Sequence, residues 1–280
     1  MELTLGIDFS RYQDDTKYDF KRLWDMGVRF IIAKSSEGLH WMDPTFIRKM
    51  ETAKKLGFIT GHFHWITPED RGDSQVDYML GNVPDELIDF HSLDVEDAFR
   101  SVHYTTFRDK KTRKQMQRIA KNGYVDVRVP SATISENARI AMERLRSRTT
   151  KPAVLYTGLW FINGYAPHMK SWMRDYPVWY ASYPDKKFYA WNRTPLEIAR
   201  GWKNLDWETF LCFNVPEKDT ALDTAFYTVD PKTGMKDKEW TIWQFTGDRI
   251  RLPGTPAVTE YDLFNGSYED LVKFIQTVEV

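Results

Sequence analysis

Two acidic residues, Asp94 and Glu96, flank a single valine at the end of the largely apolar stretch 87–93. Side chains alternate between the faces of a β-strand, so both carboxyl groups are expected on one face, about 6.6–6.8 Å apart along the backbone. Two such groups are costly to bury and hard to ionise together. One protonated acid beside one charged carboxylate is the pair that hydrolyses a glycosidic bond. A D-x-E triplet is also typical of a solvated strand end, so the pair needs support from the rest of the chain.

Strand-like and helix-like segments alternate along the 280 residues, which is typical of parallel strands joined by crossover helices. We predict strands at 3–9, 28–34, 58–65, 88–96, 152–156, 177–182, 240–245 and 258–262, and helices at 18–26, 44–56, 73–80, 135–148, 169–175 and 267–277. About eight strands in a chain of this length predict an α/β fold, a single irregular (β/α) barrel of the TIM type.

Four acids are expected to meet in such a barrel. Asp8, Asp94, Glu96 and Asp262 fall at the predicted C-terminal ends of the first, middle and last strands. Barrels of this type carry their chemistry at those ends, and closure brings the first and last strands side by side. The convergence predicts an enzyme with these four residues as its catalytic acids.

Composition limits the other classes of function. The net charge is −1, which gives no general electrostatic attraction to nucleic acid or anionic membranes. Mean hydropathy is −0.55, and no apolar run approaches the roughly 18 residues that span a bilayer. The single cysteine, Cys212, permits no internal disulfide, and no Cys/His cluster has zinc spacing. The N-terminus lacks the features of a signal peptide.

Two segments interrupt the alternation, at about 98–130 and 184–238, within one catalytic domain spanning 1–280. The first contains a basic run at 108–118, which could grip an anionic polymer or form a solvated helical face. The second is rich in tryptophan and phenylalanine, and either covers the cleft or forms a small satellite subdomain.

Blocks distributed over nearly the whole chain resemble, in order, those of glycoside hydrolase family 25, the Chalaropsis-type lysozymes. These blocks are G-I-D-F-S-R-Y-Q (6–13), F-I-I-A-K-S-S-E-G (30–38), D-P-T-F (43–46), G-H-F-H-W (61–65), L-D-V-E (93–96), P-A-V-L-Y-T-G (152–158), P-V-W-Y-A-S-Y (177–183), W-Q-F-T (243–246) and E-Y-D-L-F-N-G (260–266). The chain departs from the family pattern at Phe63, where the family usually has tyrosine, at Ser36, where threonine is common, and in its two long insertions.

The resemblance implies a muramidase that cuts the β-1,4 bond between N-acetylmuramic acid and N-acetylglucosamine in peptidoglycan, without a cofactor. Glu96 is then the candidate general acid. Asp94 is expected to stay charged, either stabilising the transition state or orienting the substrate's own acetamido group, and an inverting route remains open. Asp8 and Asp262 are expected to support the pair. Lys34 is expected to pair with Glu37 or border the groove.

Five further residues are candidates for contacting sugar from the strand ends. They are His64, Tyr156, Trp179, Tyr183 and Trp243. Each of them is also compatible with a purely structural position in the barrel.

Two other classes of protein fit part of the pattern. A non-catalytic glycan-binding barrel of a phage or secreted structural protein would keep the aromatic residues, although it would not need the four acids. A metal-dependent hydrolase could use the acids as ligands, but no HExxH-type motif is present. We expect a monomer that binds peptidoglycan, without nucleic acid or membrane insertion, made in the cytoplasm as a phage-type lysin or carrying a leader that has been removed.

Overall fold

Eight strands close into a barrel in the computed structural model, which describes residues 4–13, 17–104, 119–120, 123–181, 240–246, 254–255 and 259–277. Around the ring the strands are β1 (Thr4–Phe9), β12 (Glu260–Phe264), β11 (Ile242–Thr246), β10 (Val178–Ala181), β9 (Ala153–Gly158), β5 (Phe90–Asp94), β4 (Ile59–Trp65) and β2 (Val28–Glu37). Pairing of β1 with β2 closes the ring, and the short β3 (Trp41–Met42) extends β2. The predicted barrel is confirmed.

One strand runs against the prediction. The ring is parallel from β1 through β2, β4, β5, β9 and β10 to β11, but β12 is antiparallel to both of its neighbours. Asp8 therefore pairs with Glu260, and Gly6 pairs with Asp262, one pleat deeper. The expectation that Asp262 lies at the chemically active end is wrong, because an antiparallel strand presents its N-terminal residue there.

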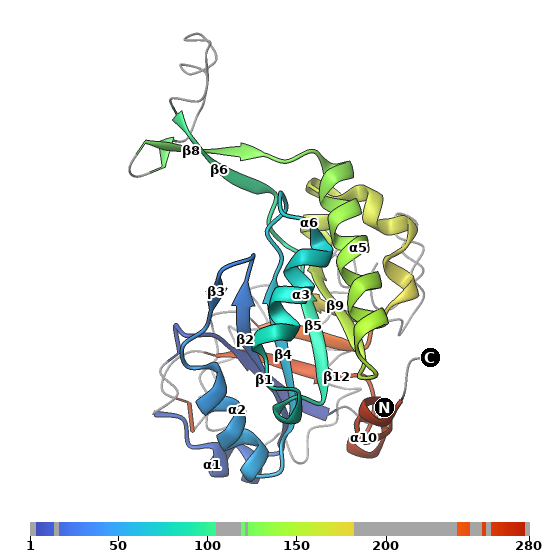
Figure 1. The fold of residues 1–280 in the computed structure, drawn as a ribbon. Coiled ribbons are helices and arrows are strands. Elements are labelled where there is room, and N and C mark those ends of the chain that lie inside the picture. Colours follow the sequence, from blue (N-terminus) through green and yellow to red (C-terminus); the bar gives the residue numbers. More distant parts are fainter. Residues whose placement is uncertain are drawn as a thin grey trace, which may run out of the picture.

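Helices cover the outside of the barrel and one of its ends (Figure 1). They are α1 (Phe20–Asp25), α2 (Phe46–Lys55), α3 (Gly72–Asn82), α5 (Ser131–Arg148), α6 (Leu159–Gly164) and α10 (Tyr268–Gln276), with 3-10 turns at Asp85–Leu87, Pro167–Ser171 and Met173–Asp175. Helix α10 places Leu271 and Phe274 against Phe90 and Phe264, so it plugs the end where the parallel strands begin. No helix in the described ranges is long and apolar enough to cross a membrane.

Helix boundaries follow local signals. Ser267 caps α10 in a capping box, in which Ser267 Oγ accepts from Asp270 N and the Asp270 carboxylate accepts from Ser267 N. Gly57 follows α2 with a φ of +86°, the left-handed conformation that ends helices and favours glycine. Gly57 thus ends α2 shortly before β4 begins at Ile59.

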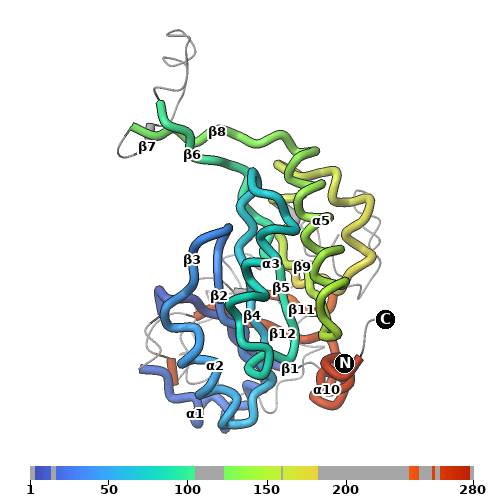
Figure 2. The backbone as a smooth tube through the Cα atoms, viewed as in Figure 1, coloured from blue at the N-terminus to red at the C-terminus, as the bar shows by residue number. Residues whose placement is uncertain are grey.

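A three-stranded antiparallel sheet forms an arm that projects from the barrel (Figures 1 and 2). It consists of β6 (Phe99–His103), β7 (Ile119–Ala120) and β8 (Tyr124–Arg128) in the order β6-β8-β7. The arm therefore lies within the predicted insertion at 98–130. The basic run at 108–118 and almost all of the second insertion, at 184–238, lie outside the described residues.

Small residues inside the barrel face large ones on the adjacent strand. Gly6 pairs with Phe30 and Gly61 pairs with Phe90, and the phenylalanine ring covers the glycine in both cases. A Cβ added at Gly61 would lie 2.2 Å from the Phe90 ring. The floor beneath the barrel mouth is thus closely packed because two strands carry no side chain at these positions.

We expect Gly61→Ala to lower the free energy of unfolding by about 1–3 kcal/mol, the usual cost of overpacking a filled core. The matched control is Gly81→Ala in α3, where an added Cβ meets nothing within 4 Å and alanine favours the helix by up to about 1 kcal/mol. Equilibrium denaturation of the two variants measures both effects. Equal stability of the two variants would show that the barrel floor tolerates added volume.

Candidate active site

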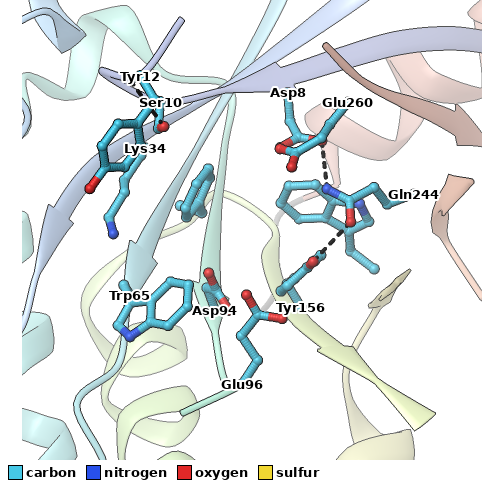
Figure 3. Close-up of a pocket in the computed structure, with 12 residues that line it drawn as sticks. Asp8, Ser10, Tyr12, Lys34, Trp65, Asp94, Glu96, Tyr156, Gln244 and Glu260 are labelled. Atoms are coloured by element: carbon cyan, nitrogen blue, oxygen red, sulfur yellow. Dashed lines mark hydrogen bonds between the residues drawn. The ribbon is translucent and has the colours of Figure 1, made fainter. Parts of the chain in front are cut away.

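A pocket of about 240 Å³ opens at the end of the barrel where the parallel strands finish (Figure 3). Its lining comprises Asp8, Ser10, Tyr12, Lys34, Phe63, Trp65, Asp94, Glu96, Tyr156, Trp179, Gln244 and Glu260. Five of the nine predicted site residues are among them: Asp8, Asp94, Glu96, Tyr156 and Trp179. The structure thus brings together acids from the first and the middle strands, as the sequence predicts.

The main chain around Val95 holds Asp94 and Glu96 on one face. Asp94 is the last residue of β5, and Glu96 lies beyond the strand end. Val95 N donates to Tyr156 O at 3.0 Å, and Thr157 Oγ1 donates to Val95 O at 2.9 Å. Both polar groups of Val95 are therefore tied to β9, and its buried side chain points away from the pocket. The strand direction continues past β5, so Glu96 faces the pocket like Asp94 (Figure 3).

The surroundings of this pair favour its protonated forms. Burial and, after it, the nearby Asp8 carboxyl raise the pKa of Glu96 to about 7, against the opposing effect of Lys34. Asp94 is only 3% exposed, and burial, followed by the charge of Glu96, raises its pKa well above the ordinary value. Two neighbouring buried carboxyl groups do not both ionise readily, so the pair retains a proton near neutral pH.

A second acidic group lies across the pocket, where β1 meets β12. Asp8 and Glu260 are neighbours in register and hydrogen-bond to each other. Burial is the main cause that raises the pKa of both carboxyl groups, with the charge of Asp8 adding to the rise at Glu260. Gln244 Nε2 donates to Asp8 Oδ2 at 2.8 Å, and Tyr156 Oη donates to Gln244 Oε1 at 2.9 Å. An uncharged amide thus links the aromatic wall to the acids (Figure 3).

Asp262 lies beneath this group and does not line the pocket. It is fully buried, and its Oδ1 accepts a hydrogen bond from Trp179 Nε1 at 2.8 Å. Burial, then the charge of Asp8, raises the pKa of Asp262 well above its ordinary value. The residue supports the site by holding the Trp179 indole, whose ring lies 4.5 Å from the Tyr156 ring between centroids.

Lys34 is the one cation among the pocket-lining residues described here. Its Nζ forms the expected ion pair with Glu37, at 2.7 Å, and lies 4.7 Å from the centre of the Trp65 ring. The positive charge lowers the pKa of Asp94 and of Glu96, although burial outweighs it in both cases. Lys34 therefore limits how strongly the acid pair holds its proton.

Two predicted sugar contacts are wrong because their side chains face the other side of the barrel wall. His64 alternates with the pocket-lining Phe63 and Trp65, is fully buried, and has its Nδ1 2.7 Å from Ser36 Oγ. Trp243 precedes the pocket-lining Gln244 and packs in the outer core, with its ring centroid 6.0 Å from that of Trp240 and 5.8 Å from that of Phe245. Tyr183 lies outside the described residues.

Trp65, Gln244 and Glu260 line the pocket although the residue patterns did not single them out. Strict alternation indicates the first two, because each is adjacent to a residue predicted to contact sugar. Predicting Glu260 as a pocket residue requires the direction of β12, which residue types do not reveal. No group of three or more His, Cys, Asp or Glu side chains within the described ranges is placed to hold a metal ion.

The pocket can therefore supply a proton near neutral pH from Glu96 and a second carboxyl from Asp94, between aromatic walls. These are the functional groups that acid-catalysed cleavage of a glycosidic bond requires. Tyr156, Gln244 and Asp8 form a hydrogen-bonded chain that begins beside the pair, since Tyr156 is the register neighbour of Asp94, and ends across the pocket at Asp8 (Figure 3).

Comparisons with known proteins place this pocket in context. The chain is 22% identical over 280 residues to the uncharacterized protein YegX of Escherichia coli O6:H1, covering 98% of this chain and 74% of that protein. It is 34% identical over 77 residues to an N,O-diacetylmuramidase of Arthroderma benhamiae, covering 28% of this chain and 32% of that protein.

The fold resembles that of a bacterial lysozyme from Streptomyces coelicolor. The TM-score is 0.63 at 18% identity, covering 97% of this chain and 96% of the lysozyme chain. The profile of glycosyl hydrolases family 25 matches residues 7–207, which include Asp8, Asp94 and Glu96. The chain therefore belongs to glycosyl hydrolases family 25.

Proposed function

We propose that this glycosyl hydrolase is a lysozyme-type muramidase that cleaves the β-1,4 bond between N-acetylmuramic acid and N-acetylglucosamine in peptidoglycan. The observation that carries the proposal is the buried Asp94–Glu96 pair in an open pocket, with the pKa of Glu96 raised to about 7. Family membership and the names of the muramidase and lysozyme relatives support the choice of substrate.

Glu96 acts as the general acid. It is the half-buried member of the pair and lines the pocket, so its carboxyl can meet the oxygen of a bound glycosidic bond. A pKa near 7 keeps it protonated at mildly acidic and neutral pH while leaving it acidic enough to donate. Proton transfer to the leaving oxygen then charges Glu96 as the bond breaks.

Asp94 acts on the other sugar atoms at the reacting centre. Among the described residues, its Oδ1 is buried without a hydrogen-bond partner. A buried acceptor of this kind is costly unless a donor arrives, and the N–H of a substrate acetamido group is such a donor. We therefore favour the substrate-assisted route. In this route Asp94 orients and stabilises the acetamido group while the acetamido oxygen attacks the anomeric carbon. An inverting route would instead use a carboxylate to activate water.

A non-catalytic glycan-binding barrel is the second candidate, since Tyr156, Trp179 and Trp65 would serve it equally well. The cost of burying several carboxyl groups at the pocket argues for catalysis, because a binding site for a neutral sugar does not need raised pKa values. A cleavage assay distinguishes the two functions.

Glu96→Gln is expected to lower the rate of peptidoglycan cleavage by at least about a hundredfold, because an amide cannot donate the proton. Released reducing sugar measures the rate, and mass spectrometry of the fragments identifies whether the new reducing end is muramic acid. Glu136→Gln, on the exposed face of α5, is the charge-matched control and should cleave at the wild-type rate. Folded wild-type protein that binds peptidoglycan and cleaves none would support the binding barrel instead.

The pH dependence of kcat/KM should show a loss of activity above about pH 7, since the general acid must be protonated and loses its proton through its raised pKa. Asp8→Asn removes a negative charge that raises the Glu96 pKa, so this limb should move to lower pH. Lys34→Met removes a positive charge that lowers it, so the limb should move to higher pH. If the two variants moved this limb of the pH profile in the same direction, or did not move it, Glu96 would not be the titrating acid.

A further inference from the structure

An aromatic cluster lies on the barrel rim outside the pocket, where the arm begins. Phe99 at the start of β6 and Trp160 in α6 are 41% and 57% exposed, respectively. Both contact Tyr165, with ring centroids 5.8 Å and 6.2 Å from it and edge-to-face geometry. We call Phe99, Trp160 and Tyr165 the rim cluster. Single exposed aromatic residues are ordinary, but contiguous ones mark binding surfaces.

The rim cluster is next to the candidate catalytic pair. Phe99 follows Glu96 by three residues, so their Cα atoms are separated by at most about 10 Å of extended chain. Gly158 lies two residues beyond Tyr156 on the same strand, and a Cβ there would be 2.5 Å from Trp160 Nε1. The indole therefore occupies the space above the strand whose Tyr156 lines the pocket. Both exposed rings border the same side of the barrel mouth.

Contacts between the arm and α6 hold these rings in place before any ligand binds. The Arg128 guanidinium, on β8, donates to Gly164 O at 2.6 Å and lies 4.7 Å from the centre of the Tyr165 ring. At the other strand of the arm, Phe99 N donates to Asp97 Oδ1 at 2.9 Å. Figure 1 shows the base of β6 beside α6. A preformed surface loses little entropy on binding, which favours affinity.

The chemical character of the rim cluster indicates which kind of ligand it can bind. The rim cluster presents aromatic faces and edges, and the charge of the neighbouring Arg128 is engaged with Gly164 O and the Tyr165 ring. Such a surface suits the C–H face of a sugar ring, which is apolar and flat. A glycan strand bound across the pocket continues beyond it. The strand can extend over this side of the barrel mouth.

We propose that the rim cluster binds an additional N-acetylated sugar of the same glycan strand, outside the pocket, and so makes the enzyme favour long strands. The inference rests on the proposed function, since it takes the glycan strand as the ligand. It assigns a role to the arm: β6 supplies Phe99, and β8 supplies the Arg128 contact that fixes Tyr165.

The test compares Trp160→Ala and Phe99→Ala with Tyr124→Ala. Tyr124 is a matched control because it is 42% exposed on the same arm but packs on His103, away from the rim cluster. Each substitution is made in the active enzyme and in the Glu96→Gln background, where binding is measured without cleavage. The ligands are long soluble peptidoglycan strands and the shortest oligosaccharide that the wild type cleaves.

We expect Trp160→Ala and Phe99→Ala to weaken binding of long strands about tenfold and to raise KM by a similar factor, with kcat unchanged. The shortest substrate should be bound and cleaved as by wild type, and Trp160→Phe should restore most of the affinity. The inference is overturned if long-strand binding is unchanged, if Tyr124→Ala is equally weakened, or if short and long substrates suffer alike. Absence of cleavage by the wild type would refute the proposed function, while the binding measurements would still decide the role of the rim cluster.

Discussion

Burial of several carboxyl groups at the mouth of one barrel is the constraint on which the rest of the site depends. Asp8, Asp94, Glu96 and Glu260 line the pocket, Asp262 lies beneath it, and burial is the main cause of the raised pKa in every case. Full ionisation of such a group would be strongly unfavourable, so protons are retained near neutral pH. A retained proton on a pocket-facing carboxyl is what a general acid requires.

The surrounding structure preserves this state by supplying little positive charge. Lys34, the single cation of the described lining, is partly neutralised by Glu37, and the bond to Asp8 comes from the uncharged Gln244 amide. An arginine in place of that amide would lower the pKa of the neighbouring carboxyl groups, and the acid would lose its proton. Aromatic walls and the plugged, closely packed barrel floor restrict water from below. The same features that make the acids costly to bury therefore make one of them able to donate.

The fold and the central pair could be predicted from residue patterns, whereas strand direction could not. Alternation of strands and helices predicts the barrel, and the D-V-E triplet places Asp94 and Glu96 on one face, as observed. Asp262 is expected at the mouth only if the last strand is parallel, and the observed antiparallel strand brings Glu260 there instead. His64 illustrates a different error, since strict alternation from Trp65 puts it behind the wall. Contacts such as that of Arg128 with Tyr165 join distant segments and leave no local signature.

A direct titration of the Glu96 carboxyl is the measurement closest to the central claim. Carbon-13 NMR of protein labelled at glutamate side-chain carboxyl groups, with the signal assigned by its loss in Glu96→Gln, reports the protonation of this group without substrate. The account predicts a midpoint near pH 7, with a further inflection where its acidic neighbours titrate. A single transition near the ordinary glutamate pKa of 4.5 would show that Glu96 is charged at neutral pH and contradict its role as the proton donor.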